Sequence, residues 1–436
     1  MMKAKHSLAL VFFPAFDWAI SPTHPEREER LLYTQDQIFE EGLFDIDGII
    51  QYKPDIATKE DIQRVHFCVP TEEAVTTESH LISAGGAITV ANAVMNKKVD
   101  KGFALVRPPG HHSMRVVHGA RGFCNINIEA IMLEYIRDTY GIDRVAIVDT
   151  DCHHGDGTQD IYWHDPDTLY ISVHQDGRTL YPGSGFHYEM GGPNALGTTI
   201  NIPLPPKTSE EGFLYALEEV ILPALDDFKP ELIINSAGQD NHYTDPITNM
   251  NFSAQGYAKL TKKLGAHIAV LEGGYSIEGA LPYVNLGIIL AMAGLDFRHV
   301  LEPDYDYEKI RQPASNTEYI KELCNEINDL RNNIDEMTPK KKIKGETKKR
   351  NRQIYYDTDN ISERQEEEVV LCDECAGALR IDSQALGRKR ICAVVIPRKA
   401  CDSCRKIGYR WFEEADRRTF DYIYLQDRVE KKYIAR

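Results

Sequence analysis

The amino-acid sequence predicts an α/β fold with a parallel sheet over residues 1–305 of a 436-residue chain. Short β-branched runs alternate there with helical stretches, which is the pattern of repeated strand–helix–strand units. The strand candidates are apolar throughout, as expected when both faces of a sheet are buried. A cluster of polar, glycine-rich residues also follows nearly every candidate strand.

Six strands and four helices are predicted in this first part. The candidate strands are Leu8–Phe12, Gly102–Val106, Arg144–Val148, Leu169–Val173, Leu232–Asn235 and Ile268–Leu271. The candidate helices are Ala84–Met95, Ile126–Thr139, Glu210–Leu225 and Ala254–Leu264.

Five of the strands run directly into residues with reactive side chains. The clusters are RPPGHH after Val106, DTDCHHGDG after Val148, HQDG after Val173, SAGQDNH after Asn235 and EGGY after Leu271. In open parallel sheets, ligands bind in the crevice at the carboxyl ends of the strands. We therefore expect five distant loops to converge on one functional site.

The composition is that of an ordinary folded protein. Hydrophobic residues make up 42% and charged residues 27% of the chain, which excludes wholesale disorder and a fibrous fold. No apolar run reaches the roughly 18 residues that would span a bilayer, and Ser7–Phe13 is interpreted as a buried first strand. Nine mostly scattered cysteines do not suit a secreted disulfide framework. We expect a cytoplasmic protein without a membrane segment.

The net charge of −17 is concentrated in the first part of the chain. Residues 1–305 carry 42 acidic and 22 basic side chains, whereas residues 306–436 carry 25 acidic and 28 basic ones. The acidic part disfavours nucleic acid as its direct partner and suits a cationic substrate. Solubility alone is the simpler explanation, and composition by itself favours it.

The chain changes character after Tyr305, and we predict three parts. These are a catalytic domain over residues 1–305, a helical and charged linker over 306–365 and a small second domain over 366–436. The linker would contain a polar helix, Glu318–Asn333, then a basic run, Lys340–Arg352, and an acidic run, Asp357–Glu368. The basic run is a candidate contact for an acidic partner, but a solvated linker is the favoured interpretation.

The segment from Asp149 to His153 is the densest group of metal-ligand residues in the chain. In an extended segment, residues 149, 151 and 153 project to one side, because side chains alternate along a strand. Asp240 is the natural third protein ligand. One histidine and two carboxylates with an open position suit a hydrolytic zinc site, although iron, cobalt and manganese stay open. The alternative is a hydrogen-bonded network without a metal.

Two adjacent histidines, His111 and His112, are candidates for acid–base chemistry. They follow a rigid Arg-Pro-Pro-Gly turn, and imidazole titrates near neutral pH. Asp149 and Asp156 are candidate partners that would fix their tautomers. Tyr275, after two glycines, either points its phenol into the site or packs as a buried aromatic.

The C-terminal part contains two CxxC pairs, Cys372–Cys375 and Cys401–Cys404, separated by 25 residues. This pattern predicts a closed zinc site with four cysteine ligands that would stabilise a small domain. A redox pair or a coincidence is the alternative. Cys392, in an apolar run between the pairs, is interpreted as a core residue. Such a domain binds nucleic acid, binds protein or docks on its own catalytic domain, and nucleic acid is the disfavoured partner.

These motifs resemble those of the histone deacetylase superfamily over roughly residues 20–300. The matching segments are HPER (24–27), RPPGHH (107–112), GFCNIN (122–127), DTDCHHGDGTQ (149–159), SVH (172–174), YPGSG (181–185), NIPLP (201–205), SAGQDNHYTDP (236–246) and LEGGY (271–275). The RPPGHH and LEGGY forms are similar to the class II-like branch, with its bacterial amidohydrolases and relation to acetylpolyamine amidohydrolases. The resemblance implies a three-layer parallel sheet of the arginase/deacetylase type, followed here by a zinc-ribbon-like segment.

The resemblance also implies a role for each matching residue. The implied zinc ligands are Asp151, His153 and Asp240; the implied catalytic residues are His111 with Asp149, His112 with Asp156, and Tyr275 as the donor to the oxyanion. Gly122 and Phe123 would line the tunnel for the acyl-lysine chain, with Tyr181 on the opposite wall, where the family often has Phe. Asp149, Ser172 and Val173 would belong to a site for a monovalent cation such as K⁺. Gln239 stands where Phe is common.

The function we expect is a zinc-dependent amidohydrolase acting on acetyl-lysine in proteins or on small acetylated amines. The alternatives are a catalytically silent module that binds acyl-lysine and an arginase-like dinuclear hydrolase. The dinuclear enzyme needs further bridging carboxylates, and Asp245 is the spare one in the late motif. The sequence gives no indication of the oligomeric state.

Overall fold

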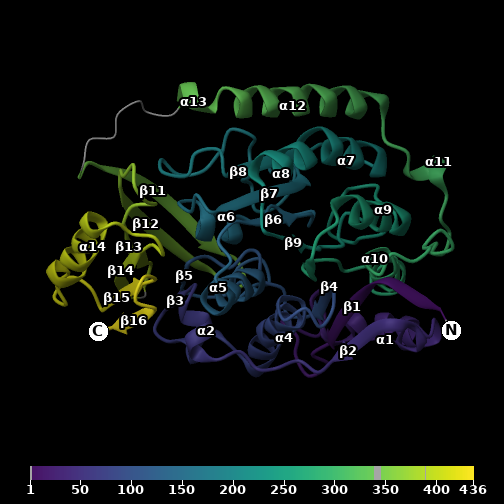
Figure 1. The fold of residues 1–436 in the computed structure, drawn as a ribbon, viewed down its shortest axis with the longest axis horizontal. Coiled ribbons are helices and arrows are strands. Elements are labelled where there is room, and N and C mark those ends of the chain that lie inside the picture. Colours follow the sequence, from purple (N-terminus) through teal and green to yellow (C-terminus); the bar gives the residue numbers. More distant parts are fainter. Residues whose placement is uncertain (1, 338–344, 388) are drawn as a thin grey trace.

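Two large sheets and one small sheet organise the chain, for which a computed structural model describes residues 2–337, 345–387 and 389–436 (Figure 1). The largest sheet has eight parallel strands in the order β2-β1-β4-β10-β9-β6-β7-β8. Its strands are β1 (Lys3–Phe13), β2 (Asp47–Tyr52), β4 (Lys101–Val106), β6 (Val145–Asp149), β7 (Thr168–Gln175), β8 (Thr199–Leu204), β9 (Leu232–Ser236) and β10 (Ile268–Val270). The predicted α/β class is confirmed, and all six predicted strands are present.

Helices cover both faces of this sheet and complete three layers (Figure 1). One face packs against α1 (Leu32–Glu40), α7 (Glu210–Ala216), α8 (Leu222–Phe228), α9 (Ala254–Leu264), α10 (Leu281–Met292) and α12 (Ala314–Asn332). The opposite face packs against α2 (Lys59–Gln63), α4 (Glu78–Met95), α5 (Ile128–Tyr140) and α6 (Asp156–Tyr162). The short helices α3 (Glu72–Val75), α11 (Tyr307–Ile310) and α13 (Ile334–Met337) lie between the longer elements, and a π-helical turn, Leu217–Ile221, joins α7 to α8.

Local sequence explains several of these elements. Strands β6 and β7 are buried along their whole length, as the apolar run Val145–Val148 predicts for β6 and the mainly apolar run Leu169–Val173 predicts for β7. α10 is buried almost all round because its sequence is apolar on every face. α5 and α9 each end at a glycine in the left-handed conformation, Gly141 and Gly265, which satisfies the last carbonyl groups of the helix.

The second large sheet forms the C-terminal domain (Figure 1). Its strands, in spatial order, are β11 (Thr347–Tyr356), β12 (Ile361–Val370), β13 (Leu379–Ala385), β14 (Arg390–Ile396), β15 (Tyr422–Asp427) and β16 (Lys432–Ala435). Neighbouring strands are antiparallel except β14 and β15, which are parallel and joined through α14 (Asp402–Glu414). The sequence did not indicate a sheet of this size.

The predicted linker over residues 306–365 is wrong at both ends. The predicted helix is α12, and its residues Ile320, Leu323 and Ile327 are buried in the core of the first domain. The C-terminal sheet begins at Thr347, well before residue 366, so β11 and the start of β12 belong to the second domain. Part of the predicted basic run Lys340–Arg352 lies outside the described residues, and the part from Thr347 onward forms β11.

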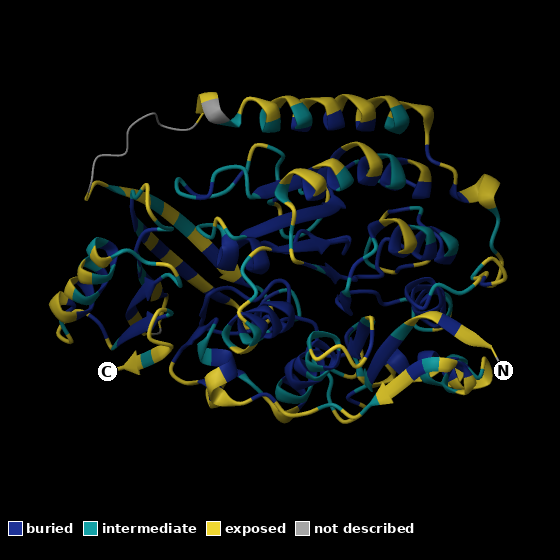
Figure 2. Ribbon diagram, in the orientation of Figure 1, coloured by how far each residue is buried: buried dark blue, intermediate teal, exposed yellow. Residues whose placement is uncertain are grey.

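Strands β14 and β15 of the C-terminal sheet are buried on both faces, whereas β11 and β12 expose alternate residues (Figure 2). α14 covers one face with an apolar cluster that includes Trp411 and Phe412. The other face packs on the catalytic domain at the two-stranded sheet of β3 (Phe67–Cys68) and β5 (Val116–Val117), where Phe67 contacts the ring of Tyr424. Of the three predicted options for this segment, the structure therefore shows docking on its own catalytic domain. Among the described residues, no helix is both long and apolar enough to cross a membrane.

Candidate active site

The polar segments that follow β4, β6, β9 and β10 meet at the carboxyl edge of the large sheet. This is the convergence that the sequence predicted, because parallel strands deliver their following loops to the same edge. The fifth cluster, at the end of β7, lies behind the other four. Its His174 contacts the ring of His154 and hydrogen-bonds to the carbonyl of Gly185.

Asp151, His153 and Asp240 form a buried group in which one ligand atom of each residue lies within 4.8 Å of the others. His153 Nδ1 lies 2.7 Å from Asp240 Oδ2 and 3.3 Å from Asp151 Oδ1. The same carboxylates accept backbone N–H groups, Asp151 from Gly273 and Asp240 from Cys152, which fixes their orientation. One imidazole and two carboxylates at this spacing fit a divalent metal such as zinc.

The two histidines pair with the two predicted aspartates. His111 Nδ1 lies 3.1 Å from Asp149 Oδ2, and His112 Nδ1 lies 2.9 Å from Asp156 Oδ1. Burial, together with the charges of His111 and His153, lowers the pKa of His112 well below its usual value. Burial also opposes protonation of His111, but the negative charges of Asp151 and Asp149 outweigh it and raise the pKa of His111.

Two residues that the sequence reasoning missed hold this histidine pair in place. The Glu272 carboxylate accepts the backbone N–H groups of Gly110 and His111 at 2.7 and 3.0 Å and so fixes the turn that presents both rings. Arg121 pairs with the second oxygen of Asp156 and is almost fully buried. An acidic residue within LEGGY and an arginine directly before GFCNIN were the available signals, because buried charges require partners.

Tyr275 is buried beside this group, with its ring edge-on to Phe123 at a centroid distance of 5.5 Å. The guanidinium of Arg30 lies over the Tyr275 ring, 4.9 Å from the ring centroid. Burial raises the pKa of the Tyr275 phenol well above its usual range, so the hydroxyl stays protonated and can donate a hydrogen bond.

Gly122, Phe123 and Tyr181 surround the same centre. The Tyr181 ring lies edge-on to the rings of His112 and His153, with centroid distances of 5.2 and 6.4 Å. Gly122 has φ +52°, and a Cβ at this position would lie 2.3 Å from the ring of His112, so only glycine fits. The Tyr181 ring and the Gly122 backbone therefore flank the His112 imidazole, and the Phe123 ring lies beside Tyr275.

Asp149 and Ser172 lie opposite each other on the neighbouring strands β6 and β7, and Val173 follows directly. The Asp149 carboxylate accepts hydrogen bonds from the Tyr170 hydroxyl at 3.0 Å and from the Asp151 N–H at 3.1 Å. The Ser172 hydroxyl pairs with His174 Nδ1 at 2.8 Å. The residues predicted to hold a monovalent cation are thus adjacent, and the cation itself stays a prediction.

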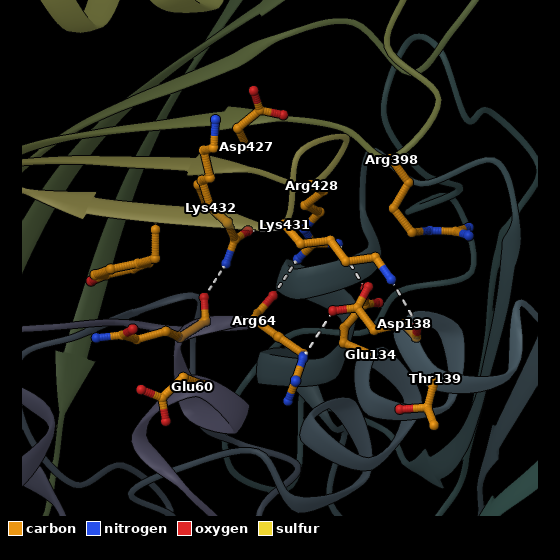
Figure 3. A pocket seen from close by; sticks show the side chains of 13 residues that line it. Glu60, Arg64, Glu134, Asp138, Thr139, Arg398, Asp427, Arg428, Lys431 and Lys432 are labelled. Atoms are coloured by element: carbon orange, nitrogen blue, oxygen red, sulfur yellow. Dashed lines mark hydrogen bonds and ion pairs between the residues drawn. The ribbon is translucent and has the colours of Figure 1, made fainter.

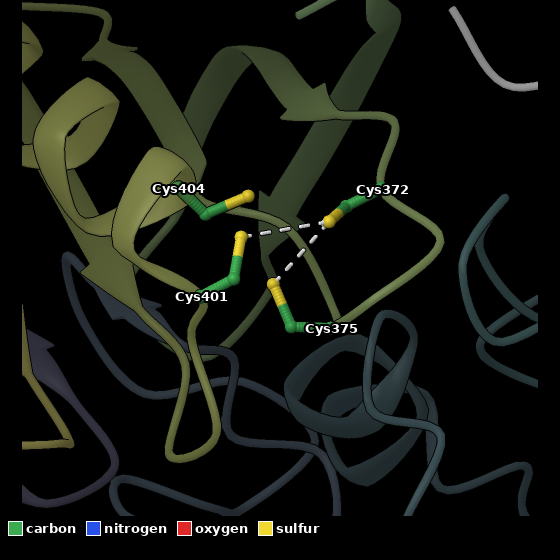
Figure 4. Close-up of side chains that lie close together, drawn as sticks. All are labelled: Cys372, Cys375, Cys401 and Cys404. Atoms are coloured by element: carbon green, nitrogen blue, oxygen red, sulfur yellow. Dashed lines mark hydrogen bonds between the residues drawn. The ribbon is translucent and has the colours of Figure 1, made fainter. Parts of the chain in front are cut away.

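The four cysteines of the C-terminal domain form a second cluster (Figure 4). Cys372 Sγ lies 3.8 Å from Cys401 Sγ and 3.7 Å from Cys375 Sγ. A tetrahedral zinc ion with Zn–S bonds of about 2.3 Å separates its sulfurs by about 3.8 Å, whereas a disulfide would bring two of them to about 2.05 Å. The described residues include all nine cysteines, and no two of these are joined in a disulfide. Hydrogen bonds, first from Cys404, lower the pKa of Cys375 to about 5. The geometry fits a closed metal site.

A cavity of about 490 Å³ lies elsewhere, between β15–β16 and the helices α2 and α5 (Figure 3). Its charged residues pair with one another: Arg428 with Glu134 at 3.3 Å, and Arg64 with Asp138 at 2.9 Å. The Arg428–Glu134 pair joins the two domains, whereas the Arg64–Asp138 pair lies within the first domain.

Comparison with known proteins agrees with this geometry. The histone deacetylase domain family matches residues 24–285. A protein named probable deacetylase from Archaeoglobus fulgidus is 46% identical over 315 residues, covering 65% of this chain and 85% of that protein. The acetoin utilization protein AcuC of Bacillus subtilis is 30% identical over 336 residues, covering 68% of this chain and 84% of that protein.

Two further similarities support the same assignment. A histone deacetylase-like amidohydrolase of Pseudomonas aeruginosa is 34% identical over 241 residues, covering 53% of this chain and 62% of that protein. The crystal structure of the HDA15 HD domain superposes with a TM-score of 0.64 at 26% identity and covers 76% of this chain and 96% of that one. Fold and site define a hydrolase of the deacetylase and amidohydrolase class. The chain belongs to the histone deacetylase family.

Proposed function

We propose that the protein is a zinc-dependent amidohydrolase that removes acetyl or other acyl groups from acetyl-lysine in proteins or from small acetylated amines. The observation that carries the proposal is the meeting of the Asp151–His153–Asp240 group, the His112–Asp156 pair and the buried Tyr275 at one sheet edge. We also propose a location in the cytoplasm, which the scattered cysteines of the chain favour.

Zinc bound by Asp151, His153 and Asp240 would polarise the amide carbonyl and acidify a water molecule. The remaining steps belong to residues of the chain. His112 donates its Nδ1–H to Asp156, so its Nε2 is free to take the proton of the attacking water. The low pKa of His112 keeps this ring neutral before the reaction. The same Nε2–H then protonates the nitrogen of the leaving amine as the C–N bond breaks.

Negative charge develops on the carbonyl oxygen as water adds, and the Tyr275 hydroxyl is the group placed to donate to it. His111 and Asp149 hold the opposite side of the site: His111 Nε2 lies 3.8 Å from Asp151 Oδ1. Phe123 and Tyr181 would flank the acyl-lysine chain with Gly122 at its base. K⁺ near Asp149, Ser172 and Val173, and a structural zinc on Cys372, Cys375, Cys401 and Cys404, complete the proposal.

The two alternatives from the sequence are less well supported. An arginase-like dinuclear site needs Asp245 as a bridging ligand, but both oxygens of Asp245 accept backbone N–H groups, from Ile247 and Tyr275. A module that only binds acyl-lysine does not require a complete His112–Asp156 pair or the buried phenol of Tyr275.

The deciding experiment is a deacetylation assay on the full chain with acetyl-lysine peptides, acetylated polyamines and longer acyl chains. We expect release of the acyl group with at least one of these, its loss on chelation and its recovery on addition of zinc. Binding of acylated substrates without any turnover would instead support the silent module. Two metal ions shared between carboxylates would support the dinuclear enzyme.

A further inference from the structure

The C-terminal domain reaches the candidate active site through the turn between β11 and β12, residues 357–360. Oδ1 of Asp357 accepts a hydrogen bond from the Tyr181 hydroxyl at 2.9 Å and one from the backbone N–H of Gly122 at 3.0 Å. One carboxylate from the second domain therefore touches both sides of the proposed acyl channel. None of the motifs in residues 1–305 contains this group.

The loop that carries Gly122 and Phe123 needs such outside support. Both residues have positive φ, +52° and +71°, and the value for Phe123 is uncommon for a bulky aromatic residue. The same turn holds the loop a second time, because the backbone N–H of Ala120 donates to Asp359 Oδ2 at 2.7 Å. The approach is so close at Gly119 that a Cβ there would lie 2.4 Å from the same oxygen.

From Asp357 a continuous polar network leads to His112. The Tyr181 hydroxyl, which donates to Asp357, accepts a hydrogen bond from the guanidinium of Arg121. Arg121 pairs in turn with Asp156, and Asp156 holds His112 Nδ1 at 2.9 Å. Arg121 thus contacts the Asp156 carboxylate directly and is linked to the Asp357 carboxylate through the Tyr181 hydroxyl. Removal of Asp357 would leave the Tyr181 hydroxyl and the Gly122 N–H without this acceptor. The two sides of the acyl channel would therefore loosen before the His112–Asp156 pair is affected.

We propose that Asp357 is a positioning residue of this enzyme: the C-terminal domain sets the width and register of the acyl channel through the contacts of Asp357 with Tyr181 and Gly122. This inference rests on the proposed function. The walls contact the substrate chain in the ground state and in the transition state alike, so their displacement weakens uniform binding and raises KM more than it lowers kcat.

The test uses four single variants of the full chain, of which the fourth, Tyr181→Phe, serves a double-mutant cycle. Asp357→Ala removes both contacts, Asp357→Asn keeps an acceptor oxygen without the charge, and Thr358→Ala is the matched control at an exposed position of the same turn. Steady-state kcat and KM are measured with an acetylated substrate that the wild type hydrolyses. Metal content and melting temperature are measured for each variant, and Tyr181→Phe is combined with Asp357→Ala in a double-mutant cycle.

We expect Asp357→Ala to raise KM at least about tenfold while kcat falls less than about threefold, since hydrogen bonds to a charged group are worth factors of this size. Asp357→Asn should lie between Asp357→Ala and wild type, and Thr358→Ala should match wild type. The combination with Tyr181→Phe should lose no more than the larger single effect. A merely structural role would lower kcat with the fraction of folded enzyme and leave KM unchanged.

Unchanged KM in both Asp357 variants, or strictly additive effects with Tyr181→Phe, would overturn the inference. If Asp357→Ala does not fold, Asp357→Asn and a cycle that combines Asp357→Asn with Tyr181→Phe decide. A wild-type chain that is inactive on every acylated amine would overturn the proposed function, whereas an active wild type whose KM ignores Asp357 would overturn this inference alone.

Discussion

The backbone N–H of Tyr275 donates to Oδ2 of Asp245 at a distance of 2.8 Å. Asp245 lies five residues after Asp240 in the loop that follows β9, whereas Tyr275 follows β10. Its other oxygen accepts the N–H of Ile247 and closes the loop on itself. One loop thus presents a candidate metal ligand and fixes the backbone from which the phenol projects.

Replacement of Tyr275 by Phe removes only the hydroxyl that we assign to the carbonyl oxygen. Loss of one such donor costs on the order of 10²–10³ in turnover, or roughly 3–4 kcal/mol. We expect kcat to fall by at least about two orders of magnitude, with fold and metal content retained. Tyr307→Phe, at an exposed position of α11, is the control. Turnover near wild type in Tyr275→Phe would refute the role.

Replacement of Asp245 by Ala should act through Tyr275. The N–H of Tyr275 would lose its acceptor and the phenol would shift, so we expect kcat to fall about tenfold. Metal content should stay at the wild-type value, because Asp245 is engaged by N–H groups and is not among the clustered ligands. Metal analysis and kinetics on the same preparation check this. A loss of metal in Asp245→Ala would reassign the residue to the metal site.

Replacement of Asp240 by Ala should remove one metal ion per chain and leave a second. Two clusters fit a metal in the described residues, and they use different residues. Wild type should therefore bind two zinc ions, Asp240→Ala and Asp151→Ala one each, and the variants should be inactive but folded. Elemental analysis of the purified proteins gives the count. Two ions bound to Asp240→Ala would show that Asp240 is not a ligand of the first metal.

Replacement of Cys401 by Ser should remove the other ion and weaken the C-terminal domain. Metal binding to a preformed site contributes directly to folding, so we expect a loss of at least about 2 kcal/mol in stability, read from the urea midpoint. Cys392→Ala, within β14, should leave the metal content unchanged. Full metal content in Cys401→Ser would contradict the four-cysteine site.

Stability should fall in mild acid in a way that depends on His66. Its Nδ1–H donates to the Met114 carbonyl at 2.8 Å, and its Nε2 accepts the N–H of Asn127 at 2.9 Å, so only the neutral ring fits. Burial lowers the pKa of His66 from 6.5 to about 4. Because the unfolded chain binds the proton first, this contribution is complete above pH 6.5 and is lost as the pH falls to about 4.

Between pH 6.5 and pH 4, the free energy of unfolding that depends on His66 falls by a total on the order of 3 kcal/mol. His66→Gln, which cannot titrate, should be less stable than wild type at pH 7 and should lose less stability between pH 7 and pH 5. Urea midpoints at both pH values measure the difference. Equal losses in the two proteins would show that other groups govern the acid response.

The site was predictable because its chemistry is written in local motifs. Apolar runs that end in His, Asp and Gly clusters indicate the carboxyl edge of a parallel sheet. The two CxxC pairs predict a site with four cysteines. The partners that hold these residues were not predictable in the same way. Glu272, Asp245 and Arg121 are single charged residues, and only the tertiary structure shows that they are buried against backbone N–H groups or a carboxylate.

Three of the strands that the sequence did not predict, β8, β11 and β12, were missed for a physical reason. β8 contains Pro203, which argues against a central strand, but β8 lies at the edge of the sheet, where a missing N–H is tolerated. In β11 and β12, runs of opposite charge resemble a solvated linker. They lie opposite each other in an antiparallel pair, in which Lys349 pairs with Glu366 at 2.7 Å and Arg350 with Glu367 at 2.9 Å.

The apolar seam between the domains has a consequence for how the chain can be divided. Phe67 and Val116 are fully shielded from solvent, and the residues that shield them include Ile381, Ile391 and Tyr424. A fragment ending at Tyr305 would expose this hydrophobic patch to water and would tend to aggregate before its activity could be assayed. We therefore expect residues 1–305 to need the C-terminal sheet as a cover in order to stay in solution.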